Sequence, residues 1–246
     1  MGGKESKVDE KVHVNTSGGS RRTQKLLPSE DGVTHFSSTL ESKGRELAKD
    51  TDGTYSVRIG FLANDSTLAK RELISRYVNG VPYAYCDMKL HNTINLDFLV
   101  KHIQVPAEPL SPAANLSSET YIGFHKVKVI VYFLGRERFR TITNSTLRQL
   151  DGLVGMYSTT SDYSLNWLKA LLDEASQHTS DSCPLAIVAD TIHEETHPTE
   201  VPREKGEKFA MDHGAVAFTE TCSNDMSDRI DKLMEALITE IFRVQP

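Results

Sequence analysis

From residue 55 onward, strand-length apolar runs alternate with segments whose apolar residues recur at helical spacing. The apolar runs are SVRIGFLA, KVKVIVYFL, DGLVGMYS, PLAIVAD and AVAFTET. The helical segments are LAKRELISRYV, SLNWLKALLDEASQ, REKGEKFAMDHG and SDRIDKLMEALITEIFRV. Strands that alternate with helices, and that are apolar along their whole length, are typical of parallel sheets buried on both faces. The sequence therefore predicts an α/β fold, an open and mostly parallel sheet with helices on both faces.

Local signals refine this pattern. Gly214 follows the helical segment that begins at residue 203, where it can end the helix in a left-handed conformation. The last helical segment carries one apolar stripe, made of Ile230, Leu233, Met234, Leu237, Ile238 and Ile241. INLDFLVKHIQV alternates like a strand, and the Pro/Ser-rich stretch near 105–120 follows it. We expect that stretch to be a long loop inserted into a hairpin.

Residues 1–54 differ from the rest in composition. They hold nine basic and nine acidic residues and a single aromatic one, Phe36, so the net charge of −6 belongs to residues 55–246. A segment rich in Ser, Gly, Thr and charge buries too little apolar area to offset its ordering entropy. We therefore predict a disordered N-terminal tail over 1–54 and a folded domain over 55–246. A short helix around residues 39–49 is the alternative for part of the tail.

Several classes of protein are disfavoured by composition. A negative net charge does not favour nucleic acid as a partner. No run reaches the roughly 18 apolar residues of a transmembrane helix, and the sequence does not start like a secretory signal. The three cysteines, Cys86, Cys183 and Cys222, are too far apart for a zinc or disulfide pattern, so reduced thiols are expected. These features predict a cytoplasmic protein.

Three segments resemble Rab-type small GTPases. GRERFRTITNSTLRQLDGLVGMYSTTSDYSLNWLKALLDE is similar to the switch II region and the elements after it, and VPREKGEKFAMDHGAVAFTETCSND is similar to the later helix, strand and guanine-base loop. INLDF resembles the switch I effector strand. The resemblance covers about residues 55–243 and implies the small GTPase (P-loop NTPase) fold.

The phosphate-binding motif is changed at most positions. The motif G-x-x-x-x-G-K-[ST] supplies backbone N–H groups that surround phosphates, a lysine for the β and γ oxygens, and a hydroxyl for magnesium. The matching stretch is 64–71, in which Lys70 is retained. Asn64 and Ala69 replace the glycines, and Arg71 stands where the magnesium-binding hydroxyl is expected. The resemblance thus leaves Lys70 as a residual phosphate ligand.

The remaining nucleotide motifs are changed as well. D-T-A-G-Q is matched by residues 132–136, which keep Gly135 but place Arg136 where the glutamine would orient water. N-K-x-D is matched by residues 190–193, with His193 in place of the base-binding aspartate. S-A-K is matched by residues 222–224, without its lysine. The switch I threonine corresponds to Thr93.

Each retained residue also has a plain structural interpretation. Lys70 could be a solvent-facing lysine at the start of an amphipathic helix, Thr93 a threonine entering a strand, and Gly135 a turn glycine. His193 and His197 lie among glutamates without the spacing of a metal-binding helix, which favours a solvated acidic loop. No metal site is expected.

A partner-binding surface is implied by the resemblance. The apolar residues Ile94, Phe98, Phe139 and Ile142 fall in or next to the switch-like segments, where this family binds its partners. RERFRTIT is kept although the catalytic residues beside it are lost, which favours a surviving surface for effector or adaptor proteins. Burial in the core would explain part of the same pattern.

The first residues fit a lipidation signal. Met-Gly-Gly-Lys-Glu-Ser matches M-G-x-x-x-[ST], which predicts N-myristoylation at Gly2 and peripheral membrane association. A single myristoyl chain binds membranes reversibly, so a second signal would be needed. The C-terminal residues contain no cysteine, so we expect the acyl chain to replace the prenyl anchor usual in Rab proteins.

Taken together, these patterns predict a Rab-like pseudoGTPase, a membrane-tethered interaction module in trafficking or signalling. No cofactor is expected, although GTP with magnesium is compatible with the fold. Catalysis is not expected, because the glutamine and the magnesium ligands are absent. The alternative is an atypical GTP-binding switch with little or no hydrolysis.

Overall fold

The computed structural model describes residues 25–27, 32–37, 45–63, 67–80, 98–107, 123–134, 140–191, 194–221 and 228–244. Its strands are β1 (Lys25–Leu27), β2 (Val33–Ser37), β3 (Ala48–Lys49), β4 (Tyr55–Ala63), β5 (Phe98–Pro106), β6 (Phe124–Leu134), β7 (Gly152–Ser158), β8 (Leu185–Asp190) and β9 (Ala217–Thr221). Its helices are α1 (Thr67–Asn79), α2 (Arg140–Leu147), α3 (Asp162–Ser176), α4 (Arg203–Asp212) and α5 (Arg229–Arg243).

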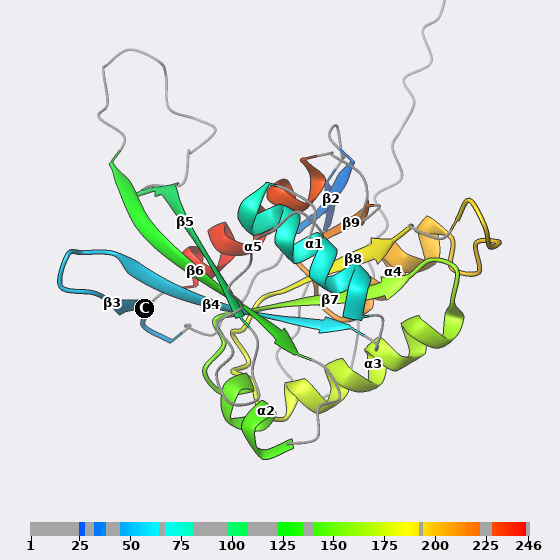
Figure 1. Ribbon diagram of the computed structural model, residues 1–246, viewed down its shortest axis with the longest axis horizontal. Helices are drawn as coiled ribbons and strands as arrows, with labels where there is room; N and C mark the ends of the chain where they lie inside the picture. The colour runs from blue at the N-terminus through cyan, green and yellow to red at the C-terminus, as the bar shows by residue number, and fades with distance from the viewer. Residues whose placement is uncertain are drawn as a thin grey trace, which may run out of the picture.

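The strands form a single sheet within the described residues, in the order β1-β2-β9-β8-β7-β4-β6-β5, and β3 pairs with β4 (Figure 1). β4, β6, β7, β8 and β9 are parallel to one another, and β5 pairs antiparallel with β6. β2 pairs antiparallel with β9, and β1 with β2. This confirms the predicted fold class, an open and mostly parallel sheet of the small GTPase type.

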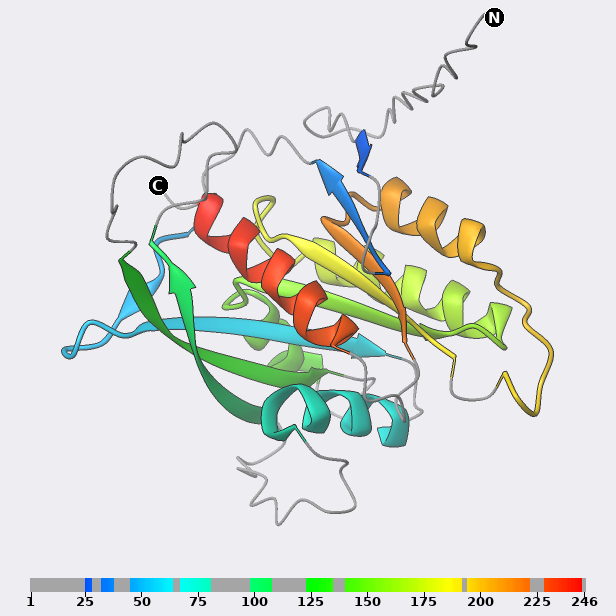
Figure 2. The same ribbon diagram turned by 90° about the horizontal axis from the view of Figure 1, so that it is seen from above.

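Helices cover both faces of the sheet (Figure 2). One apolar cluster joins α1 and α5 to the face formed by Val57, Ile59, Phe61 and the residues beside them. The other cluster joins the end of α2, α3 and α4 to the opposite face. β7 and β8 have helices on both sides, which explains why nearly all of their residues are buried.

The described elements agree with the patterns that predicted them. All six residues of the stripe on α5 are buried. α4 ends at Asp212, and Gly214 has a φ of 70°, with its N–H donating to the carbonyl of Met211. A left-handed glycine at this place ends the helix, as the sequence indicated.

The structure differs from the prediction of a disordered tail over residues 1–54. β1, β2 and β3 all lie within this range. Val33 and Phe36 in β2 are buried at 0% and 4% exposure, and Leu47 is buried at 5%. β2 is ordered because β9, far along the chain, supplies the backbone partners and the apolar contacts that a short polar segment cannot supply alone. The helix considered for residues 39–49 is also wrong at its end, where β3 forms.

The Pro/Ser-rich insert falls within a hairpin, since β5 and β6 pair antiparallel from Phe98 with Tyr132 to Pro106 with Phe124. Residues 108–122 lie outside the described residues. The prediction of a long loop at 105–120 therefore stays a prediction.

Candidate functional site

The candidate site lies at the carboxyl ends of the parallel strands. The strand registers align Ala63 of β4 with Met156, Ser158 of β7 with Asp190, and Asp190 of β8 with Thr221. After β4 the chain builds β5 and β6 on one side of that strand and then crosses to β7 on the other. Ligands of open α/β sheets bind at the carboxyl edge where the connections reverse, so the edge beside β4 is the candidate site.

The segment that matches the phosphate loop enters a helix early. β4 ends at Ala63 and α1 begins at Thr67, so Lys70 is the fourth residue of the helix. In the motif G-x-x-x-x-G-K-[ST], the residues before the lysine form a loop whose N–H groups surround phosphates. Here residues 67–69 are helical. The first turn of α1 still presents N–H groups without helical acceptors, and it carries no acidic residue.

The edge at β8 and β9 is fixed by backbone bonds. The carbonyl of Asp190 accepts from the backbone N–H of Thr159 at 3.0 Å and from its Oγ1 at 3.2 Å. The N–H of Thr191 donates to the carbonyl of Thr221 at 3.1 Å. Asp190 is 3% exposed. These bonds hold the start of the segment matched to the base-reading motif, while His193 lies outside the described residues.

A buried tyrosine lies close to this edge. Burial, and secondarily the charge of Glu220, raise the pKa of Tyr157 above its ordinary value. Its hydroxyl has no hydrogen-bond partner among the described residues. Because a phenol with a raised pKa stays protonated at neutral pH, Tyr157 cannot act there as a base.

The pKa of one aspartate at the amino ends of the parallel strands is shifted as well. Burial raises the pKa of Asp151, although the backbone N–H of Arg58 and the charge of Arg45 favour its ionised form. Its Oδ2 accepts from the N–H of Arg58 at 2.8 Å, and Arg45 lies 3.5 Å from Oδ1. Asp151 therefore fastens the beginning of β7 to β4, away from the candidate site.

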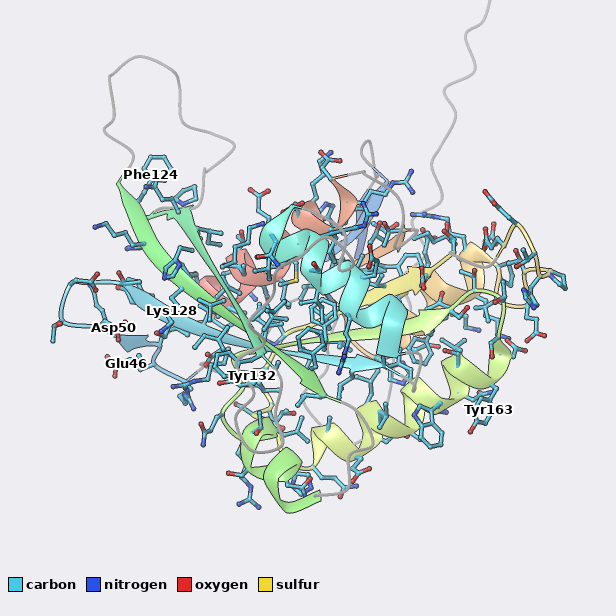
Figure 3. The ribbon with its side chains drawn as sticks, viewed as in Figure 1. Glu46, Asp50, Phe124, Lys128, Tyr132 and Tyr163 are labelled. Atoms are coloured by element: carbon cyan, nitrogen blue, oxygen red, sulfur yellow. The ribbon has the colours of Figure 1, made fainter. Side chains whose placement is uncertain are left out.

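A mixed aromatic and aliphatic face is formed by β5 and β6. Phe98 pairs with Tyr132 across the strands, with ring centroids 5.7 Å apart, and both rings are half-buried. Val100 is opposite Ile130, and His102 is opposite Lys128. Alternate residues of β6, such as Val131, point to the other face and pack against the cluster of α1 and α5. Figure 3 shows Lys128 and Tyr132 along this face.

Of the residues predicted for the site and the partner surface, one has a described side chain, Phe98. Lys70 and Ile142 lie in α1 and α2, but their side chains are outside the described residues. Outside the described residues altogether are Gly2, Thr93, Ile94, Gly135 and Phe139. Their roles stay predictions.

Sequence reasoning missed Tyr132 as the neighbour of Phe98 on the face of β5 and β6. In the motif D-T-A-G-Q, Tyr132 stands at the position of the aspartate that supports magnesium, and no other role was predicted for it. The signal was available in the period-two pattern of residues 124–134, which places Tyr132 and Ile130 on the face opposite Val131. The pairing with Phe98 required the register of β5 on β6, which a sequence pattern does not fix.

The described residues hold neither a metal-binding cluster nor a membrane-spanning helix. No group of three or more His, Cys, Asp or Glu side chains in them is arranged to hold a metal ion. No helix in the same ranges is long and apolar enough to cross a membrane. A cavity of about 180 Å³ lies among Leu153, Leu185, Cys183 and His213, at the amino ends of β7 and β8 and so away from the candidate site.

Comparison with known proteins points in one direction. A profile described as "Ras family" matches residues 61–243. The chain is 27% identical over 161 residues to Ras-related protein Rab-26 of Bos taurus, covering 65% of this chain and 54% of that protein. It is 22% identical over 180 residues to Ras-related protein Rab-12 of Mus musculus, covering 73% of this chain and 65% of that protein. The alignments thus span between half and two thirds of these relatives.

Proposed function

Since the chain belongs to the Ras family and is Rab-like, we propose that it is an interaction module with a small-GTPase fold that holds guanine nucleotide weakly or not at all. The observation that carries this proposal is the early start of α1 at Thr67. Because residues 67–69 are helical, their N–H groups point along the axis of α1, whereas the phosphate motif has a loop at these positions whose N–H groups surround the phosphates. The backbone of these residues therefore does not wrap around the β and γ phosphates as the motif does.

The residue types in the matching motifs support the same proposal. Arg71 brings a cation to the position where a hydroxyl would coordinate magnesium, and Tyr132 replaces the aspartate that would support it. His193 cannot accept the two hydrogen bonds that a carboxylate would accept from guanine. Arg136 has no acceptor with which to orient an attacking water. Binding and hydrolysis are therefore both weakened.

The function we propose is partner binding through the switch-like surface. Phe98 and Tyr132 supply a half-buried aromatic pair at one end of the β5–β6 pairing, next to Val100 and Ile130 on the same face. Aromatic groups of this kind anchor protein interfaces because they bury a large area at low entropic cost. Effector or adaptor proteins are the proposed partners, and the partner-binding roles of Ile94, Phe139 and Ile142 stay predictions from the sequence.

We also propose that the module is tethered to membranes in trafficking or signalling. The support is the sequence signal for acylation at Gly2. A reversible single-chain anchor suits a protein that moves between a membrane and the cytoplasm.

Thermal unfolding with and without ligand tests the nucleotide proposal. A ligand at a thousand times its Kd stabilises a protein by about 4 kcal/mol, which would raise the Tm of a domain of this size by roughly 10 °C. We expect no shift with millimolar GTP and magnesium. A clear shift that is lost in Lys70→Ala, but kept in the control Lys232→Ala on α5, would contradict the proposal.

The alternative function is an atypical GTP-binding switch with slow or absent hydrolysis. Its specific support is that Lys70 is retained within the first turn of α1, whose N–H groups attract anions. A rise of the Tm in the presence of GTP would favour this alternative. A measurement of phosphate release would then show whether the missing glutamine abolishes turnover.

A further inference from the structure

β9 would be the last strand of the parallel sheet, but another part of the chain covers its edge. Val33, Thr34 and His35 of β2 pair antiparallel with β9, and the N–H of Phe36 donates to the carbonyl of Val216 at 2.9 Å. β1 then pairs with β2. An uncovered strand edge presents a row of backbone groups that other chains can pair with, so β2 removes such an edge.

Side chains of β2 enter the core on both faces of the sheet. Val33 belongs to the cluster beneath α5, and Phe36 belongs to the cluster beneath α3 and α4. Thr34 points to the same face as Phe36 and is 3% exposed. β2 therefore packs in a single register, with one of its faces toward α5 and the other toward α3 and α4.

A polar cluster fastens β2 to α4 and β9. The guanidinium of Arg203 donates through Nε to Glu207 at 2.9 Å, through Nη1 to Glu220 at 3.1 Å, and through Nη2 to Thr34 Oγ1 at 3.0 Å. Thr34 Oγ1 in turn donates to Glu207 Oε1 at 2.8 Å. The planar fork of arginine suits three acceptors at once. Thr34 is the member of this cluster that belongs to β2.

The beginning of β2 contacts the end of β9 and the start of α5. The carbonyl of Gly32 accepts from Thr219 Oγ1 at 3.1 Å, and Gly32 has a φ of 80°. The side chain of Arg229 lies against Gly32, and its Nη1 donates to the carbonyl of Glu220 at 3.0 Å. β2 thus helps to hold the last residues of β9 in place.

The same residues lead into the candidate site. Thr221 follows Glu220 directly, and its carbonyl accepts the N–H of Thr191 next to Asp190. A continuous set of contacts therefore runs from Gly32 and Thr34, through the end of β9, to the carboxyl edge of β8.

We propose that β1 and β2 form a releasable arm, in which β2 pairs with the edge of β9 and thereby orders the end of β9 and the backbone of Thr191. β2 and β9 share three paired residues, so the arm opens at lower free energy than the core strands do. A ligand that requires the ordered edge favours the docked arm, and the docked arm favours that ligand by the same factor. The docking of the arm does not depend on the proposed function, and its effect on affinity concerns only a ligand that contacts the carboxyl edge.

Amide hydrogen exchange on the full chain, without nucleotide, tests the arm. Thr34→Val keeps a β-branched shape but removes the hydroxyl that Arg203 and Glu207 share. We expect about tenfold faster exchange in β2 and at the end of β9, with β4 and β7 unchanged, because a hydrogen bond to a charged group is lost. Thr179→Val is the matched control, since Thr179 Oγ1 donates to the carbonyl of Ala175 and touches neither strand.

Two results would contradict the proposal of a releasable arm. Unchanged exchange in β2 and β9 would show that the cluster does not hold the segment. Equal acceleration in β4 would show that β2 opens only when the whole domain does. Neither result depends on GTP, so the arm and the nucleotide proposal can fail separately.

A second variant tests whether the arm can be exchanged. Val33→Asp places a carboxylate in the cluster beneath α5 and should release β2. A synthetic peptide of residues 25–37, at millimolar concentration, should then restore protection at β9 in the variant but change nothing in the original protein. Absence of protection by the peptide, with β4 still protected in the variant, would contradict a releasable arm.

Discussion

Gly206 in α4 shows how closely two layers approach at a single residue. A methyl group added at Gly206 would fall against the hydroxyl of Tyr157 and the ring of Phe218. Tyr157 is 1% exposed, and its hydroxyl finds no hydrogen-bond partner among the described residues. The close approach therefore combines a steric requirement for glycine with an unsatisfied polar group.

We expect Gly206→Ala to lower the free energy of unfolding by about 1–2 kcal/mol, because overpacking outweighs the better helix propensity of alanine.

Tyr157→Phe should raise that free energy by about 1 kcal/mol, since it removes a buried hydroxyl without a partner. Urea unfolding of both variants and of the double variant measures the coupling, which should be favourable. The control is Tyr163→Phe, at a residue 64% exposed, with no expected change. A stabilising Gly206→Ala would disprove the close contact.

At the scale of elements, one lysine joins three of them. Lys101 in β5 donates to the carbonyl of Tyr77 near the end of α1 at 2.6 Å and pairs with Asp231 in α5 at 2.9 Å. Its ammonium also lies 4.0 Å from the centre of the Tyr77 ring. A cation at the C-terminal end of a helix interacts favourably with the helix dipole.

Lys101→Met should therefore lower the free energy of unfolding by about 1 kcal/mol, mostly through the lost bond to the Tyr77 carbonyl, because the pair with exposed Asp231 is weak. Lys232→Met is the matched control, because Lys232 pairs with the exposed Asp228 at the surface of α5. Denaturant unfolding should show little change for that control. Equal losses in the two variants would mean that Lys101 acts as an ordinary surface charge.

The elements differ in how far their own residues determine them. β7, β8 and α5 were predicted because their apolar patterns are continuous and their periods are clear. β2 was not, because Val33 and Phe36 gain their stability from β9 and from helices encoded far along the chain. Local composition cannot report a partner of that kind.

The candidate site was predictable in its residue types rather than in its place and its contacts. The changed letters at 64–71 and 132–136 are visible in the sequence, whereas the position of the carboxyl edge beside β4 required the strand order of the folded chain. The contacts of Arg203 are not visible, since Thr34, Glu207 and Glu220 meet only in the folded chain. The early start of α1 is likewise a feature of the backbone that the motif comparison did not contain.

At the scale of the whole molecule, the arm sets where the preceding chain leaves the domain. β1 pairs antiparallel with β2 and so runs parallel to β9. Lys25 therefore lies toward the amino ends of the parallel strands, opposite the candidate site.

If Gly2 carries a myristoyl group, Gly2→Ala should move the protein from the membrane fraction to the soluble fraction, because without Gly2 no acyl chain can be attached. Fractionation of cells that express the two proteins measures this. Gly3→Ala is the matched control and should stay with the membranes. Unchanged partitioning of Gly2→Ala would contradict the lipid anchor.

The antiparallel pairing of the arm also gives the molecule a mechanical weak point. A force applied to the chain ahead of Lys25 separates Lys25 from Ser37 first, then Leu26 from Phe36, and then Leu27 from His35. Pairs broken one after another resist far less than pairs sheared together. Under tension between an anchored N-terminus and a partner held on β5 and β6, β1 would separate from β2 before the parallel strands come apart.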